Sequence, residues 1–570
     1  MTQQKQNGKL IAIITMIFLF GMISFVTNLA APMGIVLKNQ FSVSNALGML
    51  GNFGNFIAYA VMGIPSGILL QRVGYKKTAL IAVAVGFIGV GIQYLSGHSS
   101  PDMAFAVYLI GAFIAGFSMC LLNTVVNPML NKLNEVLDYT FLSNVFSVQS
   151  DCPAREKFGY GGDIVGVART FCWFYDMENF YRKAIRDFAN DQRPSGGMTE
   201  TAPFNGIADK GLGEDSGPIG WQLAFAFMQK QLYDYYGDLE TIKNYYPIFV
   251  KQVEFIRSQA KNNMIEDCIN DHESLEQRIP ALFATAHYYH HALLLSEFAS
   301  LLNKQEDAKK YKTLSEEIKK AFISRFLISG DGIVGNGTQA AQAFALYYGL
   351  LPDTEKKAAL DGLLKAIEKR DGHIAAGIFG VPAILNVLRE NDRNDIAYKM
   401  VTQTSFPGWG HMLQSGATTL WETWQYSDNV YSHNHPMFGS VGEWMYQSLG
   451  GINTTAPGFS EIVIKPQPTE GLDWVNCCYQ SVNGKITSNW KAENEAFTLH
   501  VCIPVNSEAV VYIPASRTAS VKEGGKAINE TEGIKPLGYE NGYHRFTVGS
   551  GNYSFLSLIH ISEPTRRTPI

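Results

Sequence analysis

The distribution of charge along the chain constrains its fold more than any other feature. Residues 1–134 contain one acidic residue, Asp102, and seven basic residues. The rest of the 570-residue chain holds 39 of its 46 basic residues, 50 of its 51 acidic residues and all eight tryptophans. Long uncharged apolar segments are typical of membrane-spanning helices, whereas soluble domains carry charge throughout. The sequence therefore joins two parts of different chemistry.

Four uncharged runs of 28, 33, 24 and 29 residues divide the N-terminal part. Each exceeds the ~20 residues that cross a bilayer as a helix. We expect four transmembrane helices, near 10–33, 47–70, 78–96 and 103–129, with many glycines that permit close helix packing. Basic residues gather in the loop at 72–77, so the positive-inside rule predicts that this loop and the chain after residue 133 face the cytoplasm.

Two N-terminal segments carry a family resemblance. The sequence GILLQRVGYKK at 67–77 and the sequence NTVVNPML at 123–130 resemble major facilitator sugar permeases of the fucose type. Gln71 stands where that family has an acidic residue. The family has twelve helices in two halves, with its substrate between the halves. The resemblance covers about 1–130 and implies only a partial, four-helix transporter.

Apolar residues recur at helical spacing through most of the second part. We expect helices at 135–149, 164–190, 220–236, 239–260, 280–303, 306–327, 338–350, 353–369, 376–390, 393–404, 418–426 and 436–449. Asp238 and the pair Pro352 and Asp353 are typical helix starts. Twelve helices joined by short loops predict six antiparallel pairs, an (α/α)6 barrel over 131–455.

The hydrophobic period changes to two after about residue 456. The segments 461–465, 484–490, 496–502 and 508–513 alternate between apolar and polar residues, as strands do. We therefore predict a C-terminal antiparallel β-sandwich over 456–556. The remaining residues, 557–570, have no apolar period and resemble translated adapter DNA, so we expect an artefactual or disordered tail.

The segment 150–163 is the densest cluster of charge with glycine. Asp151, Arg155, Glu156 and Asp163 lie within thirteen residues that also contain Pro153 and three glycines. Such a segment predicts a loop between helices, where catalytic side chains are commonly presented. From the residues alone, a solvated loop with local salt bridges is the favoured interpretation.

A second cluster combines a carboxylate with indoles. Four of the eight tryptophans, among them Trp409, Trp421 and Trp424, lie within 36 residues, and Glu422 stands between two of them. An unpaired buried carboxylate is costly, so this arrangement favours a site over a plain core. Aromatic faces with carboxylates suit sugars, and two opposed carboxylates are the minimum for hydrolysing a glycoside.

The sequences DCPAREKFGY at 151–160 and GATTLWE at 416–422 together resemble the bacterial α-L-rhamnosidases of glycoside hydrolase family 78, over about 131–556. The resemblance implies an (α/α)6 barrel, a β-sandwich and an inverting mechanism, with Glu156 as the general acid and Glu422 as the general base. It also implies that Asp151 and Arg155 hold the rhamnose hydroxyls.

The first motif departs from the family in two places. It is one residue shorter than the common Arg-Asp-Glu-Arg form, and Tyr160 replaces the usual tryptophan. Asp151 is therefore the alternative acid. The remaining candidate substrate contacts are Tyr160, Asp163, Trp221, Trp409 and His435.

Other candidate residues weigh less. The polar loop at 267–273 carries Asp271 and Glu273. His287, His290 and His291 lie on a strongly apolar helix, which favours core positions over a metal site. The sequence has no phosphate-binding loop, dinucleotide fingerprint or CxxC pair, so we expect neither cofactor nor metal. A net charge of -5 gives no support for a nucleic-acid partner.

The expected function is removal of terminal α-L-rhamnose from glycosides or polysaccharides. Two alternatives are a sugar-permease fragment with an incidental soluble part, and a carbohydrate-binding module without activity. If the fusion is real, the protein is membrane-associated through 1–130 with a cytoplasmic enzyme part, although family relatives are often periplasmic or secreted. The unusual joining of the parts and the adapter-like tail also suggest a chimeric reading frame with its junction near 129–134.

Overall fold

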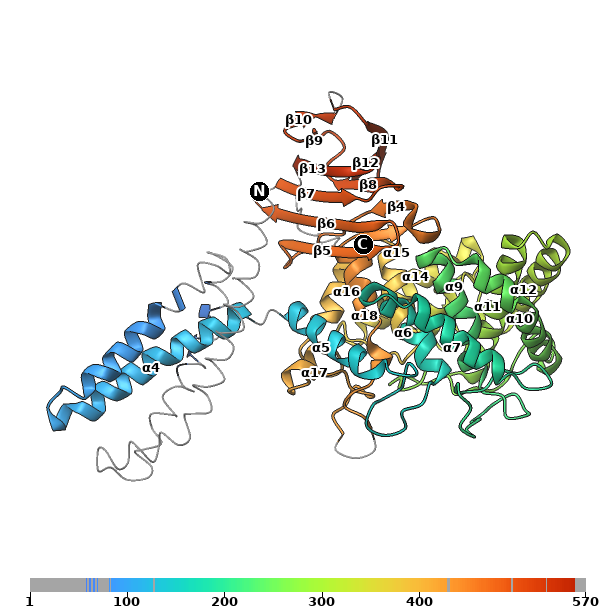
Figure 1. The fold of residues 1–570 in the computed structure, drawn as a ribbon, viewed down its shortest axis with the longest axis horizontal. Coiled ribbons are helices and arrows are strands. Elements are labelled where there is room, and N and C mark those ends of the chain that lie inside the picture. Colours follow the sequence, from blue (N-terminus) through green and yellow to red (C-terminus); the bar gives the residue numbers. More distant parts are fainter. Residues whose placement is uncertain are drawn as a thin grey trace. The chain divides into compact units, whose positions relative to one another are not determined.

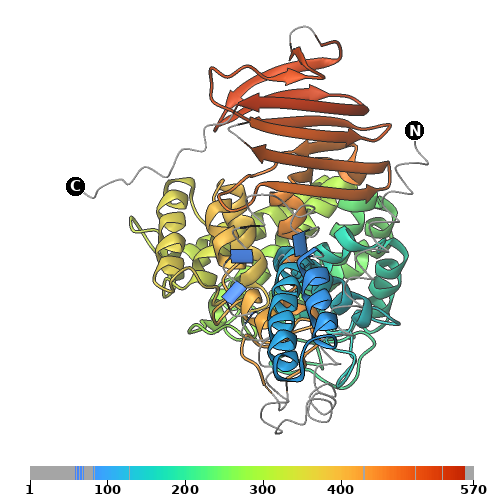
Figure 2. The same cartoon turned by 90° about the vertical axis from the view of Figure 1, so that its left-hand side faces the viewer.

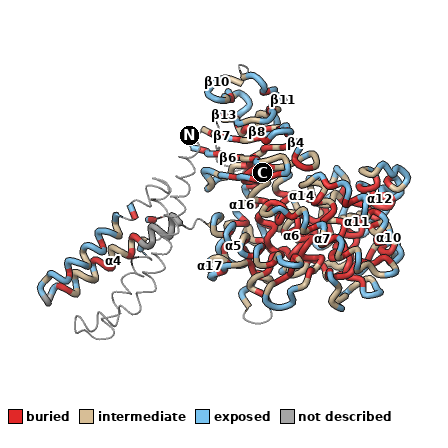
Figure 3. Tube along the Cα trace, viewed as in Figure 1, coloured by how far each residue is buried: buried red, intermediate tan, exposed pale blue. Residues whose placement is uncertain are grey.

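The computed structural model describes residues 84–126, 129–427, 431–493, 496–528 and 531–558, together with scattered positions from 58 to 82. The chain divides into two compact units, 1–132 and 133–570. In the second unit, a body of helices lies next to a stack of strands (Figures 1 and 2). Buried residues fill the middle of the helical body (Figure 3).

The first unit contains a helical hairpin. The helix that includes 84–96 turns at 97–100 into α4 (Pro101–Val126). A β-carbon on Gly89 would lie 2.6 Å from the Ala115 amide nitrogen, and one on Gly111 would lie 2.7 Å from the Gln93 amide nitrogen. Glycine is therefore required at both positions, because the two backbones meet there without side chains between them.

The predicted transmembrane helices find no support in this hairpin. The span predicted at 10–33 lies outside the described residues, as does most of the span at 47–70, whereas α4 coincides with the span at 103–129. Among the helices whose residues the structure describes, none is both long and apolar enough to cross a membrane.

The helical part of the second unit is a toroid of packed helices. Its helices are α5 (Met129–Asn144), α6 (Gly161–Phe174), α7 (Glu178–Asn190), α8 (Ile219–Gln222), α9 (Ala224–Tyr236), α10 (Leu239–Gln259), α11 (Pro280–Leu301), α12 (Gln305–Phe326), α13 (Gln339–Tyr347), α14 (Asp353–Glu368), α15 (Gly380–Glu390), α16 (Asn394–Val401), α17 (Trp409–Gln414) and α18 (Val441–Trp444). The short strands β1 (Leu327–Ile328) and β2 (Ile333–Val334) pair after α12. A 3-10 turn, η1 (Pro436–Phe438), precedes α18, and a π turn, η2 (Met445–Leu449), follows it.

Most predicted helices and their starts are confirmed. Asp238 accepts a hydrogen bond from the Thr241 amide at 3.0 Å and so caps α10. Two predictions are wrong. The single helix expected at 164–190 is two helices, because Tyr175 adopts an extended conformation that ends α6. The segment 418–426, predicted to be a helix, is irregular. Its backbone is hydrogen-bonded to 432–435: the Glu422 amide donates to the Ser432 carbonyl, and the His435 amide donates to the Leu420 carbonyl.

The C-terminal part is a β-sandwich, as predicted. Its strands are β3 (Ile452–Thr454), β4 (Glu461–Ile464), β5 (Trp474–Ser481), β6 (Gly484–Glu493), β7 (Ala496–Ile503), β8 (Glu508–Pro514), β9 (Lys522–Glu523), β10 (Lys526–Ala527), β11 (Ile534–Glu540), β12 (Tyr543–Val548) and β13 (Gly551–Leu558), with a 3-10 turn, η3 (Pro457–Phe459). One sheet has the order β10-β9-β13-β7-β6-β5 and the other β11-β12-β8-β4-β3. The pairing is antiparallel except between β4 and β8, which are parallel.

Helix α6 connects the two ends of the toroid. Its first residues, Gly161 to Asp163, follow directly on the 151–160 loop. Its last turn reaches the sandwich, where the Trp173 ring stacks on Tyr446 at 5.2 Å and lies 4.6 Å from Tyr479 of β5. At a rise of ~1.5 Å per residue, the ten residues from Asp163 to Trp173 span ~15 Å. The loop and the sandwich therefore lie at opposite ends of this helix.

Candidate active site

The 151–160 loop is closed by its own backbone. The Asp151 amide donates to the Phe158 carbonyl at 3.1 Å, and the Phe158 amide donates back to Asp151 Oδ1 at 2.9 Å. Lys157 adopts a left-handed conformation, with φ of 61°, which turns the chain back sharply. The closed loop projects Arg155 and Glu156, whose side chains are 42% and 41% exposed, while Asp151 stays buried.

The start of α6 is packed tightly against Trp221. A β-carbon on Gly162 would lie 2.3 Å from the Trp221 ring, and one on Gly161 would lie 2.1 Å from its carbonyl oxygen. Only glycine permits this approach, so Trp221 lies against the helix terminus that carries Asp163. Asp163 is buried, and its Oδ1 is 3.4 Å from His435 Nδ1. Burial raises the pKa of Asp163 and lowers the pKa of His435 to about 3.

The 420–435 segment holds Glu422 in place. The Ser432 amide donates to Glu422 Oε2 at 2.6 Å, and the Glu422 amide donates to the Ser432 carbonyl at 2.9 Å. The Glu422 side chain is 15% exposed, and burial raises its pKa, with a further rise from the negative charge of Glu156. Glu422 is therefore an oriented carboxyl group that still reaches solvent.

Arg155 brings the two predicted catalytic residues together. Its guanidinium nitrogens lie 3.6 Å from Glu156 Oε1 and 3.9 Å from Glu422 Oε2. Both distances exceed those of a charge-assisted hydrogen bond, so neither carboxylate is locked to the arginine. The two carboxylates, 266 positions apart in sequence, both lie within 4 Å of the same guanidinium group.

Asp151 lies close to Glu156, with one carboxylate oxygen of each within 4.8 Å. The pKa of Asp151 is raised to about 6, mainly by burial and also by the nearby Glu156, while bonds from Cys152 and Phe158 act to lower it. Asp151 therefore keeps its proton up to a pH near 6. A carboxyl group with a raised pKa is what a general acid requires.

One ligand atom each of Asp151, Cys152 and Glu156 lie within 4.8 Å of one another, a set that could hold a metal ion. A cysteine binds metal as the thiolate. Burial and the hydrogen bond to Asp151 raise the pKa of Cys152, which favours the protonated thiol. The cluster therefore suits proton transfer better than metal binding.

The structure gathers most, but not all, of the predicted substrate contacts. Burial raises the pKa of Tyr160, followed by the charges of Glu156, Glu200, Asp151 and Asp163, so its hydroxyl lies among carboxylates. Trp409 is different. It is fully buried, its indole N–H donates to the Phe438 carbonyl at 3.0 Å, and its ring meets Trp424 edge-on. The structure therefore makes Trp409 a core residue and leaves it outside the site.

Three residues near the site carried little or no signal in the sequence. The charge of Glu156 acts on His272, and the charge of Glu273 acts on both His272 and Glu422. Glu200 is buried beside the start of α6, and burial raises its pKa to about 7. Of the three, the sequence marks Glu273 as a candidate, because it lies in the polar loop at 267–273. A lone histidine or glutamate outside a motif gives no sequence signal.

Asp271 and the histidine cluster are structural. Asp271 is fully buried and accepts hydrogen bonds from the amides of Gly377, Phe379 and Gly380 at 2.7 to 2.9 Å. Burial lowers the pKa values of His287, His290 and His291, which keeps the three rings neutral in the helical core.

The architecture defines the class of protein. A helical toroid followed by a β-sandwich is the architecture of a six-hairpin glycosidase. The family model of the bacterial alpha-L-rhamnosidase 6 hairpin glycosidase domain matches residues 123–449, and that of the bacterial alpha-L-rhamnosidase C-terminal domain matches 451–527. The chain belongs to the bacterial α-L-rhamnosidase family.

Known proteins resemble both parts of the chain. An α-L-rhamnosidase of Streptomyces avermitilis is 32% identical over 433 residues, 74% of this chain and 41% of that protein. The crystal structure of Streptomyces avermitilis α-L-rhamnosidase complexed with L-rhamnose matches with a TM-score of 0.69 at 31% identity, covering 75% of this chain and 41% of that chain. The chain spans less than half the length of the curated rhamnosidases it matches. A glucose/galactose transporter of Brucella abortus is 26% identical over 135 residues, 24% of this chain and 31% of that protein.

Proposed function

We propose that the protein is an inverting α-L-rhamnosidase that removes terminal rhamnose from glycosides or polysaccharides. The observation that carries the proposal is the pair of carboxylates that lie 3.6 Å and 3.9 Å from Arg155, with Glu156 on the loop before α6 and Glu422 on the loop before η1. The similarity to a rhamnosidase crystallised with L-rhamnose supports this choice of sugar.

Glu156 is the proposed general acid. Its carboxyl proton passes to the glycosidic oxygen as the bond to the anomeric carbon breaks, and the aglycone leaves as an alcohol. Asp151 then returns the proton that Glu156 lost, or serves as the acid itself if Glu156 does not reach the leaving oxygen.

Glu422 is the proposed general base. It accepts a proton from a water molecule whose oxygen attacks the anomeric carbon from the face opposite the leaving group. The Ser432 amide holds the carboxylate in one orientation, which fixes the line of attack. The positive charge of Arg155 lowers the pKa of Glu422 and so opposes the rise caused by burial.

The sugar is proposed to be held by the polar residues between these two carboxylates. Asp151, Arg155 and Asp163 offer charged partners to hydroxyl groups, and Tyr160 and neutral His435 offer further polar contacts. Trp221, packed against the start of α6, offers an indole near the same position.

The stereochemistry of the first product tests the mechanism. Early NMR spectra of an α-linked aryl rhamnoside digest are expected to show β-L-rhamnose, and the two carboxyl groups are expected to lie roughly 6.5–9.5 Å apart. Early α-L-rhamnose would make Glu422 a nucleophile in a retaining enzyme. Binding of rhamnose without any hydrolysis would favour a carbohydrate-binding module instead.

The N-terminal part carries a separate proposal. We infer a partial sugar-permease segment at 1–130, supported by its uncharged runs and by the likeness to a glucose/galactose transporter, ahead of a barrel at 131–455 and a sandwich at 456–556. Long-read sequencing of the source DNA across 129–134 tests whether the fusion is real. An interrupted reading frame there would separate the two parts and remove the membrane association.

A further inference from the structure

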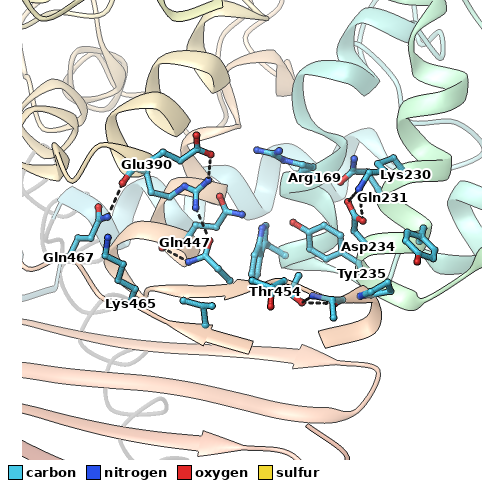
Figure 4. Close-up of a pocket in the computed structure, with 18 residues that line it drawn as sticks. Arg169, Lys230, Gln231, Asp234, Tyr235, Glu390, Gln447, Thr454, Lys465 and Gln467 are labelled. Atoms are coloured by element: carbon cyan, nitrogen blue, oxygen red, sulfur yellow. Dashed lines mark hydrogen bonds and ion pairs between the residues drawn. The ribbon is translucent and has the colours of Figure 1, made fainter. Parts of the chain in front are cut away.

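The junction between the toroid and the sandwich holds a cavity of about 690 Å³. The cations that line it are paired with carboxylates, as Lys230 is with Asp234 at 2.6 Å (Figure 4). The 151–160 loop and Glu422 do not line it. Groups that the proposed mechanism leaves unused lie instead near the active site, in the polar loop at 267–273.

The polar loop at 267–273 ends in a tight turn. The Ser274 amide donates to the Asp271 carbonyl at 3.1 Å and closes the turn. The Asp271 carboxylate and the His272 carbonyl accept four hydrogen bonds from consecutive amides of the 377–380 segment, at 2.7 to 2.9 Å. The backbone of the turn is therefore fixed to that segment.

The same part of the chain also holds the segment that carries Glu422. The indole N–H of Trp424 donates to the Ala376 carbonyl at 2.9 Å, and the Leu275 amide donates to the carbonyl of the residue before Ala376, also at 2.9 Å. The turn and the Glu422 segment are therefore bound to consecutive carbonyls. The charge of Glu273 adds to the rise that burial causes in the pKa of Glu422, as expected of a carboxylate close by.

Glu273 occupies a position of this turn that favours glycine. Its φ is 59°, in the left-handed region, where a side chain is strained and glycine or asparagine is the usual residue. The Glu273 side chain is 19% exposed. The other charged residues with a left-handed φ in the described part of the chain are all exposed: Lys157, Lys210, Glu214, Asp215, Asp371 and Asp392. A strained backbone that carries a partly buried carboxylate is typical of a functional position.

The Glu273 carboxylate has room for a ligand. It accepts no hydrogen bond from the residues that the structure describes, and its 4.0 Å distance to His272 Nε2 is too long for one. Burial lowers the pKa of His272, so its ring is neutral near neutral pH and does not cancel the charge of Glu273. A partly buried carboxylate is costly unless it is hydrogen-bonded, so a bound molecule with a hydrogen to donate would stabilise it.

We propose that Glu273 is a positioning residue for the water that attacks the anomeric carbon, an inference that rests on the proposed inverting hydrolysis. One hydrogen of the water is directed at Glu422 and the other at Glu273, because a carboxylate only accepts hydrogen bonds. Two acceptors on one water molecule aim its oxygen lone pair at the anomeric carbon.

Glu273 neither gains nor loses a proton in this step. The water oxygen forms a bond to the anomeric carbon while the bond to the glycosidic oxygen breaks. The glycosidic oxygen keeps the electron pair and takes the proton of the general acid, and Glu422 takes one proton of the water. The other proton stays in the new hydroxyl group, hydrogen-bonded to Glu273.

Glu273→Gln tests the position with the smallest change of shape. We expect kcat on an aryl α-L-rhamnoside to fall about tenfold and KM to change by no more than about twofold, because the water and not the sugar loses its partner. The substitution also removes a charge that raises the pKa of Glu422, whereas Glu156 still raises and Arg155 still lowers it. The low-pH limb of kcat/KM, where the base becomes ionised, should therefore move down by about half a pH unit.

Glu273→Gly separates this role from a role in folding. Glycine relieves the left-handed φ, so the thermal midpoint should be no lower than in the wild type, while kcat falls at least as far as in Glu273→Gln. Glu214→Gln is the matched control, because Glu214 is also left-handed, with φ of 49°, but exposed. It should keep the wild-type kcat, KM and pH profile.

Three results would overturn this inference alone. They are wild-type kcat with an unmoved limb in Glu273→Gln, a raised KM with wild-type kcat, which would make Glu273 a contact of the sugar, and a lower thermal midpoint together with lower activity in Glu273→Gly, which would make Glu273 structural. A wild-type protein that binds rhamnose without hydrolysing it would overturn the proposed function as well.

Discussion

Arg155 and Arg169 show two uses of the same side chain within one protein. Arg155, on the loop before α6, is 42% exposed and stays 3.6 Å and 3.9 Å from its two carboxylates. Arg169, on α6 at the other end, is 24% exposed and makes direct contact with Glu443, which is 3% exposed. Arg155 is therefore not held in a direct hydrogen bond by either of its two carboxylates, whereas Arg169 is bound directly to Glu443.

The difference concerns which groups are free to exchange protons. Around Arg155, burial raises the pKa of Asp151 to about 6 and also raises the pKa of Glu422, so both carboxyl groups hold a proton more readily than an exposed carboxyl group does. At Arg169, burial acts to lower the arginine pKa, but the charge of Glu443 outweighs it and raises this pKa. A loose pair suits catalysis, whereas a tight buried pair suits assembly of the domain junction.

Substitution of Glu422 is the most severe test of the carboxylates around Arg155. Glu422→Gln is expected to lower kcat on an aryl α-L-rhamnoside by about 10³-fold, ~4 kcal/mol, because the amide cannot accept the proton of the attacking water. L-Rhamnose binding and the thermal midpoint are expected to change little. Exposed Glu316→Gln is the matched control and should keep full activity. Wild-type turnover by Glu422→Gln would remove this residue from the mechanism.

Breaking the tight pair is expected to act on stability. Arg169→Met leaves Glu443 buried without its cation and should lower the free energy of unfolding by about 3 kcal/mol. Lys312→Met, which breaks an exposed pair with Glu316, should cost no more than about 1 kcal/mol. Urea denaturation monitored by tryptophan fluorescence measures both. Similar losses in the two variants would erase the distinction between the ends of α6.

Asp271 shows that not every carboxylate near the mouth is loose. In Asp271→Asn, an amide NH₂ group replaces a carboxylate oxygen that accepts hydrogen bonds from backbone N–H groups, so donors face donors. We therefore expect the free energy of unfolding to fall by about 2 kcal/mol. Asp395→Asn, at an exposed ion pair with Arg393, is the control and should change little. A variant as stable as the wild type would make Asp271 dispensable for the fold.

The smallest expected effect is a shift in pH dependence. A carboxyl group with a raised pKa is protonated below that value and ionised above it, so wild-type kcat/KM should fall as the pH rises through about 6, where Asp151 loses its proton. In Asp151→Asn, the limb near pH 6 should be lost, whatever the absolute activity. A limb at the same pH in both proteins would assign the proton to another group.

Local sequence patterns were sufficient for most of the architecture. The helical period predicted α9 to α12 closely, Asp238 marked the start of α10, and alternation predicted β4 and β6 to β8. The predictions failed where local signals were weak or absent. Nothing in the apolar pattern of 164–190 marks the extended Tyr175, and the 418–426 segment bonds to residues ten or more positions away instead of forming a helix.

The sequence by itself determined the two chemistries of the chain, the order of its folded parts and the two motifs that hold Glu156 and Glu422. The tertiary structure alone decided which side chains share a site. It placed Trp221 against Gly162 and buried Trp409 in the core. It also bound Asp271 to amides far along the chain, and it left the buried indole N–H of Trp173 without a hydrogen-bond partner among the described residues. The physical reason is range: helical and strand periods depend on neighbouring residues, whereas burial, pKa and cavity depend on contacts between residues far apart in sequence.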